Sequence, residues 1–312
     1  MIVEQKNAAR RIKNTNRLFL SSLCFVTIAS FGIGRMGMNF SMETSLIISQ
    51  MLFWIPITLY LLITRTNPLR LIPFHKISIS TVGMVILFGL LLIPVMTWIN
   101  LISMMFVENT VAAIDQQMQR NSLLFNLLLM AVMPAFSEEF MIRGIYFQQY
   151  RESGIFKGAV ISGLVFGLMH MNFNQFSYAA VLGIILALLV EATGSIFSSI
   201  IVHFVFNAYS VFIAHFQDQI LTMTGDAVIQ EVTRSDIVEM TISYTSVAFI
   251  VGILAFSVFL WIVQHCKTTE HMKQIFVSNY SEEGKKIKVM TPSFVIGVVI
   301  GFGLMILLEW IS

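Results

Sequence analysis

The chain has 312 residues, of which 56% are hydrophobic and only 12% are charged, and its formal net charge is +2. Soluble domains carry about 25% charged residues, so this composition and a mean hydropathy of +0.81 exclude an ordinary soluble protein. The positive charges flank apolar runs of bilayer length; we therefore expect a lipid bilayer as the surroundings and no nucleic-acid partner.

Nine apolar segments are predicted to cross the membrane as helices, which makes the expected fold an all-α polytopic membrane domain. The segments are 18–34, 44–64, 79–107, 122–142, 156–172, 177–192, 196–215, 242–264 and 293–311. The third is overlong and contains Pro94, which predicts a kink or a tilt.

Basic residues are distributed unevenly over the loops between these segments. They cluster before the first span and after the second, fourth and eighth, whereas the opposite loops hold only Arg35, Arg120 and Arg234. Because basic loops stay in the cytoplasm, we expect a cytoplasmic N-terminus and, after nine spans, a C-terminus outside the cell membrane. The acidic loop 217–240 then lies outside.

The stretch "SEEFMIRG" places Glu138, Glu139 and Arg143 at the end of a long apolar run. An ionisable residue inside a span costs several kcal/mol to bury, so it is a functional-site hypothesis by default. Glu139 and Arg143 have the i,i+4 spacing of an ion pair, while Glu138 points about 100° away and lacks that partner. Pro134 predicts a kink just before the acids. The alternative is a solvated helix end.

Two histidines and an amide follow on the next spans. His170 closes "FGLMH", and His203 opens "HFVFN", which Asn207 closes one turn later. Alone, each histidine is typical of a satisfied polar group between packed helices. If the chain turns near Gly154, Glu138 and His170 lie sixteen residues before and after the turn, so they come level in an antiparallel hairpin. The four polar groups are therefore predicted to meet.

The sequence also predicts a close contact between helices and a constraint on the length of one of them. Gly163 and Gly167 have the small-xxx-small spacing that lets membrane helices approach closely. A continuous helix over 121–150 would be about 45 Å long, which exceeds a hydrocarbon core of about 30 Å, so it must tilt, break or protrude. Glu191 and His215 stand at span ends, where we expect interfacial groups.

The motifs "EEFMIR", "FGLMH" and "HFVFN", in this order on successive spans, resemble the E-E-x-x-x-R, F-x-x-x-H and H-x-x-x-N motifs of one family. This is the family of CAAX prenyl endopeptidases and bacteriocin-processing proteins, also called Abi, and the resemblance covers about 120–215. It implies an intramembrane endopeptidase of the glutamic type. Glu138 would be the general base and His170 would help to activate water, while His203 and Asn207 would stabilise the oxyanion. Glu139, Arg143 and Phe166 would support the site.

With this resemblance the chain divides into three parts. We expect three N-terminal spans in 1–119, a four-helix catalytic core in 120–215, and a loop with two C-terminal spans in 216–312. The resemblance allows prenylated protein tails, bacteriocin leaders or peptide pheromones as substrates, and we expect a short peptide or a protein tail presented at the membrane. Partner membrane proteins of a processing or signalling system are compatible with it.

Three other interpretations stay open. Glu, His and His are also zinc ligands, which suggests a metalloprotease, although the H-E-x-x-H helix is missing. A non-catalytic regulator or immunity protein of the same family is a second alternative. A transporter is the third alternative, and the lack of an internal repeat argues against it. We expect neither a cofactor nor a bound metal.

Overall fold

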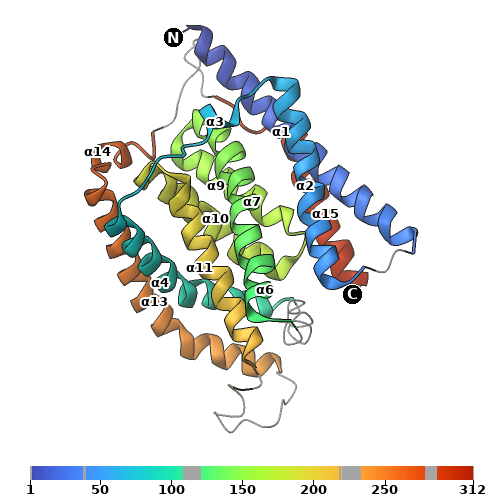
Figure 1. Ribbon diagram of the computed structural model, residues 1–312, viewed down its shortest axis with the longest axis vertical. Helices are drawn as coiled ribbons and strands as arrows, with labels where there is room; N and C mark the ends of the chain where they lie inside the picture. Colours follow the sequence, from blue (N-terminus) through green and yellow to red (C-terminus); the bar gives the residue numbers. More distant parts are fainter. Residues whose placement is uncertain are drawn as a thin grey trace.

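The computed structural model describes residues 2–37, 40–107, 121–217, 219, 233–277 and 287–311. Over these ranges every regular element is a helix and no strand occurs. Eight of the helices are long and apolar enough to cross a membrane. Figure 1 shows the helices gathered into one elongated bundle, with the start of the chain at the top. The predicted all-α polytopic fold is therefore confirmed.

The described elements are a succession of helices. The N-terminal part comprises α1 (Ile2–Arg35), α2 (Met42–Thr64), α3 (Pro68–Leu71) and α4 (Ile79–Met104). The next helix is subdivided into α6 (Leu123–Leu127), η1 (Leu128–Val132), α7 (Met133–Glu139), η2 (Phe140–Tyr146), α8 (Phe147–Tyr150) and η3 (Arg151–Ser153). After it come α9 (Ile155–Met169), α10 (Phe173–Thr193), α11 (Ile196–His215), α13 (Arg234–His265), α14 (Thr269–Met272) and α15 (Pro292–Ile311).

Most long helices begin at a side chain that caps them. A serine, threonine or asparagine oxygen accepts a backbone N–H of the first turn, which satisfies a donor that has no partner inside the helix. The capping residues are Ser41, Ser78, Ser122, Asn172, Ser195 and Thr233. At Thr233 the contact is reciprocal, because Asp236 accepts the Thr233 N–H in a capping box.

Several predicted boundaries differ from the structure. The first predicted span, 18–34, lies within α1, which begins at Ile2, and the fourth, 122–142, belongs to a helix that continues to Ser153. The fifth predicted span, 156–172, corresponds to α9, which has only 15 residues and is about 22 Å long at 1.5 Å per residue. The eighth, 242–264, begins earlier, at Arg234, so part of the predicted loop 217–240 is helical. The rest of that loop, 218 and 220–232, lies outside the described residues.

The helix that carries the acid pair is not a regular α-helix. It runs from Leu123 to Ser153 and contains two π-helical stretches, η1 and η2, a feature that is frequent at functional sites. Pro134 stands in the first turn of α7, directly after η1, where a break in the regular hydrogen-bond ladder accommodates a residue without an N–H. The helix ends at Gly154, whose φ of 127° favours glycine.

The glycines of α9 bring it close to α10. A Cβ atom built on Gly163 would lie 2.7 Å from the carbonyl oxygen of Ala180, and one on Gly183 would lie 2.8 Å from the Cα of Gly163. Gly167 faces the same helix at Phe176. The close approach expected from the glycine spacing therefore joins α9 to α10.

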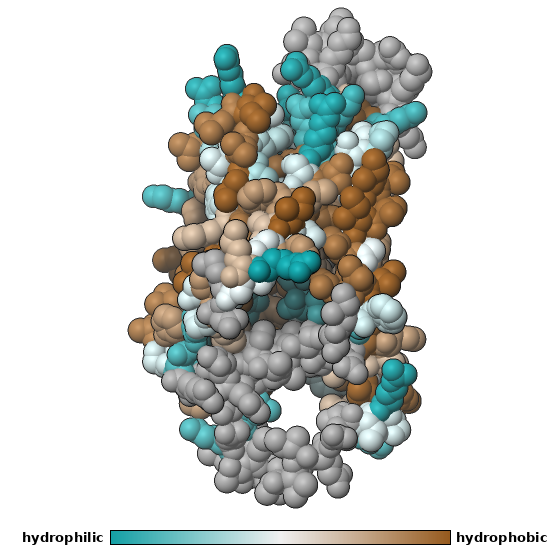
Figure 2. All heavy atoms as spheres, turned by 90° about the vertical axis from the view of Figure 1, so that its right-hand side faces the viewer, coloured by the Kyte–Doolittle hydropathy of each residue, from teal (hydrophilic) through white to brown (hydrophobic). Residues whose placement is uncertain are grey.

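The flanking helices share cores with the central ones. One cluster of buried side chains joins α1, α2, α9 and α15 to the helix of the acid pair, and a second joins α4, α10, α11 and α13. Figure 2 shows broad hydrophobic areas on the face on the side of α1, α2 and α15, with hydrophilic residues gathered at its upper end and a further one near its middle. Exposed large apolar side chains of α2 and α15 include Leu59, Leu62, Ile63, Val299 and Ile306. Such a surface suits lipid contact, and the chain is an integral membrane protein.

Candidate active site

All four residues predicted to be catalytic line one cavity. Glu138, His170, His203 and Asn207 border a space of about 250 Å³ that also touches side chains of α2, η1 and α10. α7 supplies the acid, α11 supplies His203 and Asn207, and His170 directly follows α9. The hairpin around Gly154 and the packing of α11 against α7 thus bring together groups up to 69 positions apart in the sequence.

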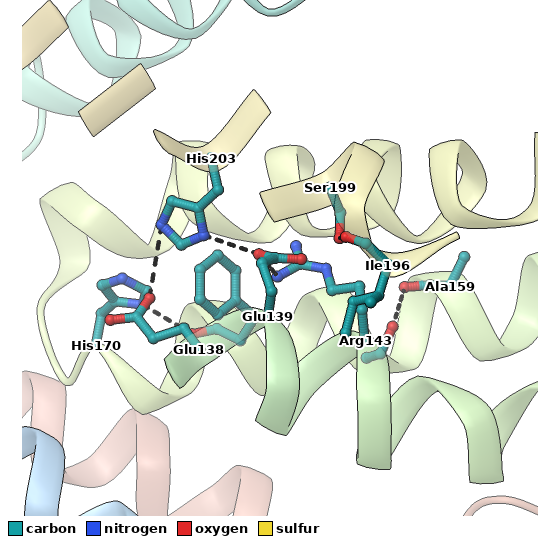
Figure 3. A network of polar contacts seen from close by, with 10 residues as sticks. Glu138, Glu139, Arg143, Ala159, His170, Ile196, Ser199 and His203 are labelled. Atoms are coloured by element: carbon teal, nitrogen blue, oxygen red, sulfur yellow. Dashed lines mark hydrogen bonds and ion pairs between the residues drawn. The ribbon is translucent and has the colours of Figure 1, made fainter. Parts of the chain in front are cut away.

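Glu139 and Arg143 form an ion pair inside the protein. The Arg143 Nη1 atom lies 2.6 Å from Glu139 Oε1, and both side chains are fully buried. This excludes the alternative of a solvated helix end. The guanidinium also lies 4.6 Å from the centre of the Phe166 ring, a cation–π contact that is stronger where water is excluded. Figure 3 shows the pair between α7 and α11.

Glu138 faces the cavity and has partners of its own. Gln50 of α2 donates its Nε2–H to Glu138 Oε1 at 2.9 Å, and the Ser137 hydroxyl donates to the side-chain oxygen Oε1 of Gln50. The expectation that Glu138 lacks an arginine partner holds, but it is not without a hydrogen bond. Gln50 was not selected from the sequence because it is not ionisable, although it is the single amide of the apolar segment 44–64.

His203 lies between the two glutamates. Its Nδ1 atom is 2.8 Å from Glu139 Oε1 and its Nε2 atom is 3.8 Å from Glu138 Oε2. The ring is 5% exposed, against 19% for Glu138. Figure 3 shows the imidazole bridging the acids from above. Glu139 Oε1 therefore accepts hydrogen bonds from both Arg143 and His203, and this fixes the orientation of the imidazole.

His170 is oriented by the helix that it follows. Its Nδ1 atom lies 2.8 Å from the carbonyl oxygen of Phe166. Because a carbonyl only accepts, Nδ1 carries the proton, and in the neutral ring Nε2 is left as an acceptor. The Phe166 ring makes edge contacts with both histidines, at centroid distances of 4.8 Å to His170 and 5.9 Å to His203. Phe166 thus separates the two imidazoles and supports Arg143.

Asn207 lies one turn after His203 on α11 and is half-buried. It borders the cavity, and its side-chain amide forms no hydrogen bond with another residue of the described ranges. The amide N–H is therefore available to a bound molecule. The same cavity is bordered on α10 by Gln175 and Tyr178, neither of which was predicted from the sequence.

Glu191, at the end of α10, is buried within the protein. It is 4% exposed and pairs with Arg151 at 2.9 Å and with His271 at 2.6 Å. These partners were not predicted, because the sequence spacing does not reveal that α14 packs against the end of α10. This cluster lies apart from the cavity and ties α10 to the end of the site helix.

The zinc alternative requires Glu138, His170 and His203 to act as ligands of one ion. Within the part of the chain that the structure describes, no group of three or more His, Cys, Asp or Glu side chains is placed to hold a metal.

Comparison with protein families finds a match for the central segment. Residues 120–209 match the type II CAAX prenyl endopeptidase Rce1-like family. The matched segment contains all three motifs, so the resemblance predicted from them is confirmed. Comparisons with curated proteins and with solved structures give no match.

Proposed function

We propose that the protein is an intramembrane endopeptidase that hydrolyses a peptide bond with a glutamate-activated water. The observation that carries the proposal is the convergence of Glu138, His170, His203 and Asn207 on one cavity within the membrane-embedded bundle. The Rce1-like match over the same segment supports it.

In this proposal Glu138 is the general base. Gln50 holds Oε1, so Oε2, on the side of His203, takes a proton from water in the cavity. His170 accepts a second hydrogen bond from the same water through Nε2. The water oxygen bonds to the substrate carbonyl carbon, and the carbonyl π electrons move onto its oxygen. As the tetrahedral intermediate collapses, the C–N bond breaks, and protonated Glu138 returns its proton to the leaving amine.

His203 and Asn207 stabilise the oxyanion. His203 donates Nδ1–H to Glu139. To donate through Nε2 as well, the ring must be the imidazolium ion, in which both nitrogens are protonated. Two carboxylates, Glu138 and Glu139, are then balanced by Arg143 and His203, and a neutral cluster suits an environment of low polarity. Each oxyanion donor contributes about 3 kcal/mol to the stability of the transition state.

The substrate is a short peptide or a protein tail presented at the membrane. We place the N-terminus in the cytoplasm because of the distribution of basic residues. The mechanism uses no cofactor. Membrane proteins of a processing or signalling system are the proposed partners, and a non-catalytic regulatory role is the competing function.

A glutamine substitution at Glu138 tests the proposal. Glu138→Gln keeps the shape of the side chain and an acceptor for Gln50 but cannot take a proton. Turnover of a cleavable peptide, found by screening a peptide library against the protein in detergent, should fall by a factor of about 10² to 10⁴ with an unchanged melting temperature. Glu270→Gln, at an exposed acid, is the control. Near-normal turnover in Glu138→Gln would end the assignment, and no cleavage by the wild type would favour the regulator.

A further inference from the structure

The active-site cavity extends from the proposed reacting groups toward the end of the bundle that holds α6 and the last turns of α11. Its border includes Leu129, nine positions before Glu138, and Ala214, eleven positions after His203. At 1.5 Å per residue these side chains stand about 14 Å and about 16 Å further along the bundle. Leu46, in the first turns of α2, borders the same region. The cavity therefore leads from the acid toward this end, which Figure 1 shows at the bottom.

The opposite side of the reacting groups is filled by packed side chains. Every residue over 141–150 of the site helix (Leu123–Ser153) is buried, and Tyr146 and Tyr150 are fully buried. The buried ion pair of Glu139 and Arg143 stands between these tyrosines and the cavity along the same helix. The ion pair thus forms the floor of the cavity, and a peptide does not reach it along the helix from this end.

The filled end of the bundle carries most of the basic residues. Figure 1 places the start of α1, α3 and α14 together in its upper part. The basic residues of these segments and of the positions beside α14 are Arg10, Arg11, Lys13, Arg17, Arg70, Lys267 and Lys273. At the other end, the described ranges hold Arg35 and Arg234. Basic segments stay in the cytoplasm, so this distribution directs the filled end inward and the cavity outward.

The wall that α10 and α11 give to the cavity is polar but uncharged at the groups nearest the opening. Gln175 and Tyr178 of α10 and Asn207 and Ser210 of α11 supply amides and hydroxyls, whereas η1 supplies apolar side chains. Amides and hydroxyls both donate and accept hydrogen bonds. Such a wall can satisfy the backbone N–H and C=O groups of an extended peptide that enters a poorly hydrated space.

We propose that the cavity opens to the outer side of the membrane and takes its substrate, a peptide segment, from that side. The inference rests on the proposed endopeptidase function and narrows the substrate class. Exported peptides, and segments of membrane proteins just outside the bilayer, belong to this class. A protein tail held at the cytoplasmic surface does not.

Single cysteines show which side of the membrane the cavity opens to. Cys24→Ala and Cys266→Ala remove the two native thiols, and Ser210→Cys then places one on the cavity wall. Glu239→Cys on α13 and Glu270→Cys on α14 are matched markers of the two ends, since both glutamates are exposed. Intact cells that express each chain are treated with a membrane-impermeant maleimide. Ser210→Cys and Glu239→Cys should react, and Glu270→Cys should react only after the membrane is permeabilised.

Three results of this labelling would overturn the inference. Ser210→Cys that reacts only after permeabilisation, like Glu270→Cys, would place the opening on the cytoplasmic side. Glu239→Cys and Glu270→Cys with exchanged behaviour would reverse the orientation of the whole chain. Ser210→Cys that reacts only once the protein is unfolded would show that the cavity is closed at this end.

Cleavage by intact cells separates the inference from the endopeptidase function. A cleavable peptide from the library screen is added to cells that express the wild type or Glu138→Gln, and the products are measured in the medium. Only the wild type should cleave it. Cleavage that requires permeabilised cells keeps the endopeptidase function and overturns the outward cavity. Outer labelling of Ser210→Cys without cleavage by intact or permeabilised cells supports the outward cavity, and the endopeptidase function alone then fails.

Discussion

The Nδ1 atom of His203 lies 2.8 Å from Oε1 of Glu139, the same oxygen that receives Arg143 at 2.6 Å. One buried carboxylate oxygen therefore joins α11 to the site helix and sets the direction of the imidazole. Glu139 acts on the cavity through His203 and does not face it. The two adjacent glutamates have different tasks because their side chains leave the helix in different directions.

Loss of either partner of the buried ion pair should destabilise the protein. Glu139→Ala and Arg143→Ala each leave an uncompensated buried charge, at a cost of about 3–5 kcal/mol. A lowered melting temperature in detergent is expected, with partial recovery when Glu139→Gln is combined with Arg143→Met. Lys273→Ala, in the exposed pair with Glu270, is the control and should cost less than about 1 kcal/mol. Wild-type melting of both single variants would show that the pair contributes little.

His203→Ala and Asn207→Ala distinguish the oxyanion mechanism from a zinc mechanism. Each removes one donor in the proposed mechanism, so turnover should fall by about 100-fold or more in both, and chelators should not inhibit the wild type. In a zinc site, His203 would be a ligand and its loss would abolish metal binding, whereas Asn207 would be peripheral. Metal analysis decides the matter: one zinc per chain that is lost with His203→Ala contradicts the glutamate mechanism.

Gln50→Leu should lower turnover without changing the fold. The substitution removes the hydrogen bond to Glu138 Oε1, a contact to a charged group worth about 1.5–3 kcal/mol, so a loss of about tenfold to 100-fold in kcat is expected. Gln50→Glu should be worse, because it places a second negative charge beside the base. Equal turnover of the wild type and both variants would show that Gln50 does not position Glu138.

Because α9 and α10 are in close contact, substitution by alanine should destabilise the protein at the glycines of this contact and not at a glycine with free space around it. Gly163→Ala and Gly183→Ala introduce a Cβ atom within 3 Å of backbone atoms of the facing helix, so the helices must separate and the melting temperature should fall. Gly83→Ala in α4 meets no atom within 4 Å and should stabilise the helix by about 0.5–1 kcal/mol. Similar melting temperatures for all three variants would contradict the close packing.

The features predicted from the sequence are those that depend on local spacing. The Glu139–Arg143 contact follows from four residues of helix, and the meeting of Glu138 and His170 follows from a turn at Gly154. The partner of Glu138 was not predictable in this way, because Gln50 is 88 positions away and its helix had no assigned role. The burial of Glu191 depends on His271, which is 80 positions away. The short α9 depends on where the backbone turns at Met171.

The first π-helical stretch has a consequence for how the length of this chain can vary. A π turn holds one extra residue without rotating the rest of the helix. Deletion of one residue within 128–132 can therefore restore a regular α-helix, and Glu138 and Glu139 then keep their directions. Deletion of one residue within 133–137, where the helix is α-helical up to the acids, turns them by about 100° relative to the preceding turns. Related chains that differ by a single insertion or deletion in this helix should therefore carry it before Met133, and deletions scanned through the helix should be tolerated there first.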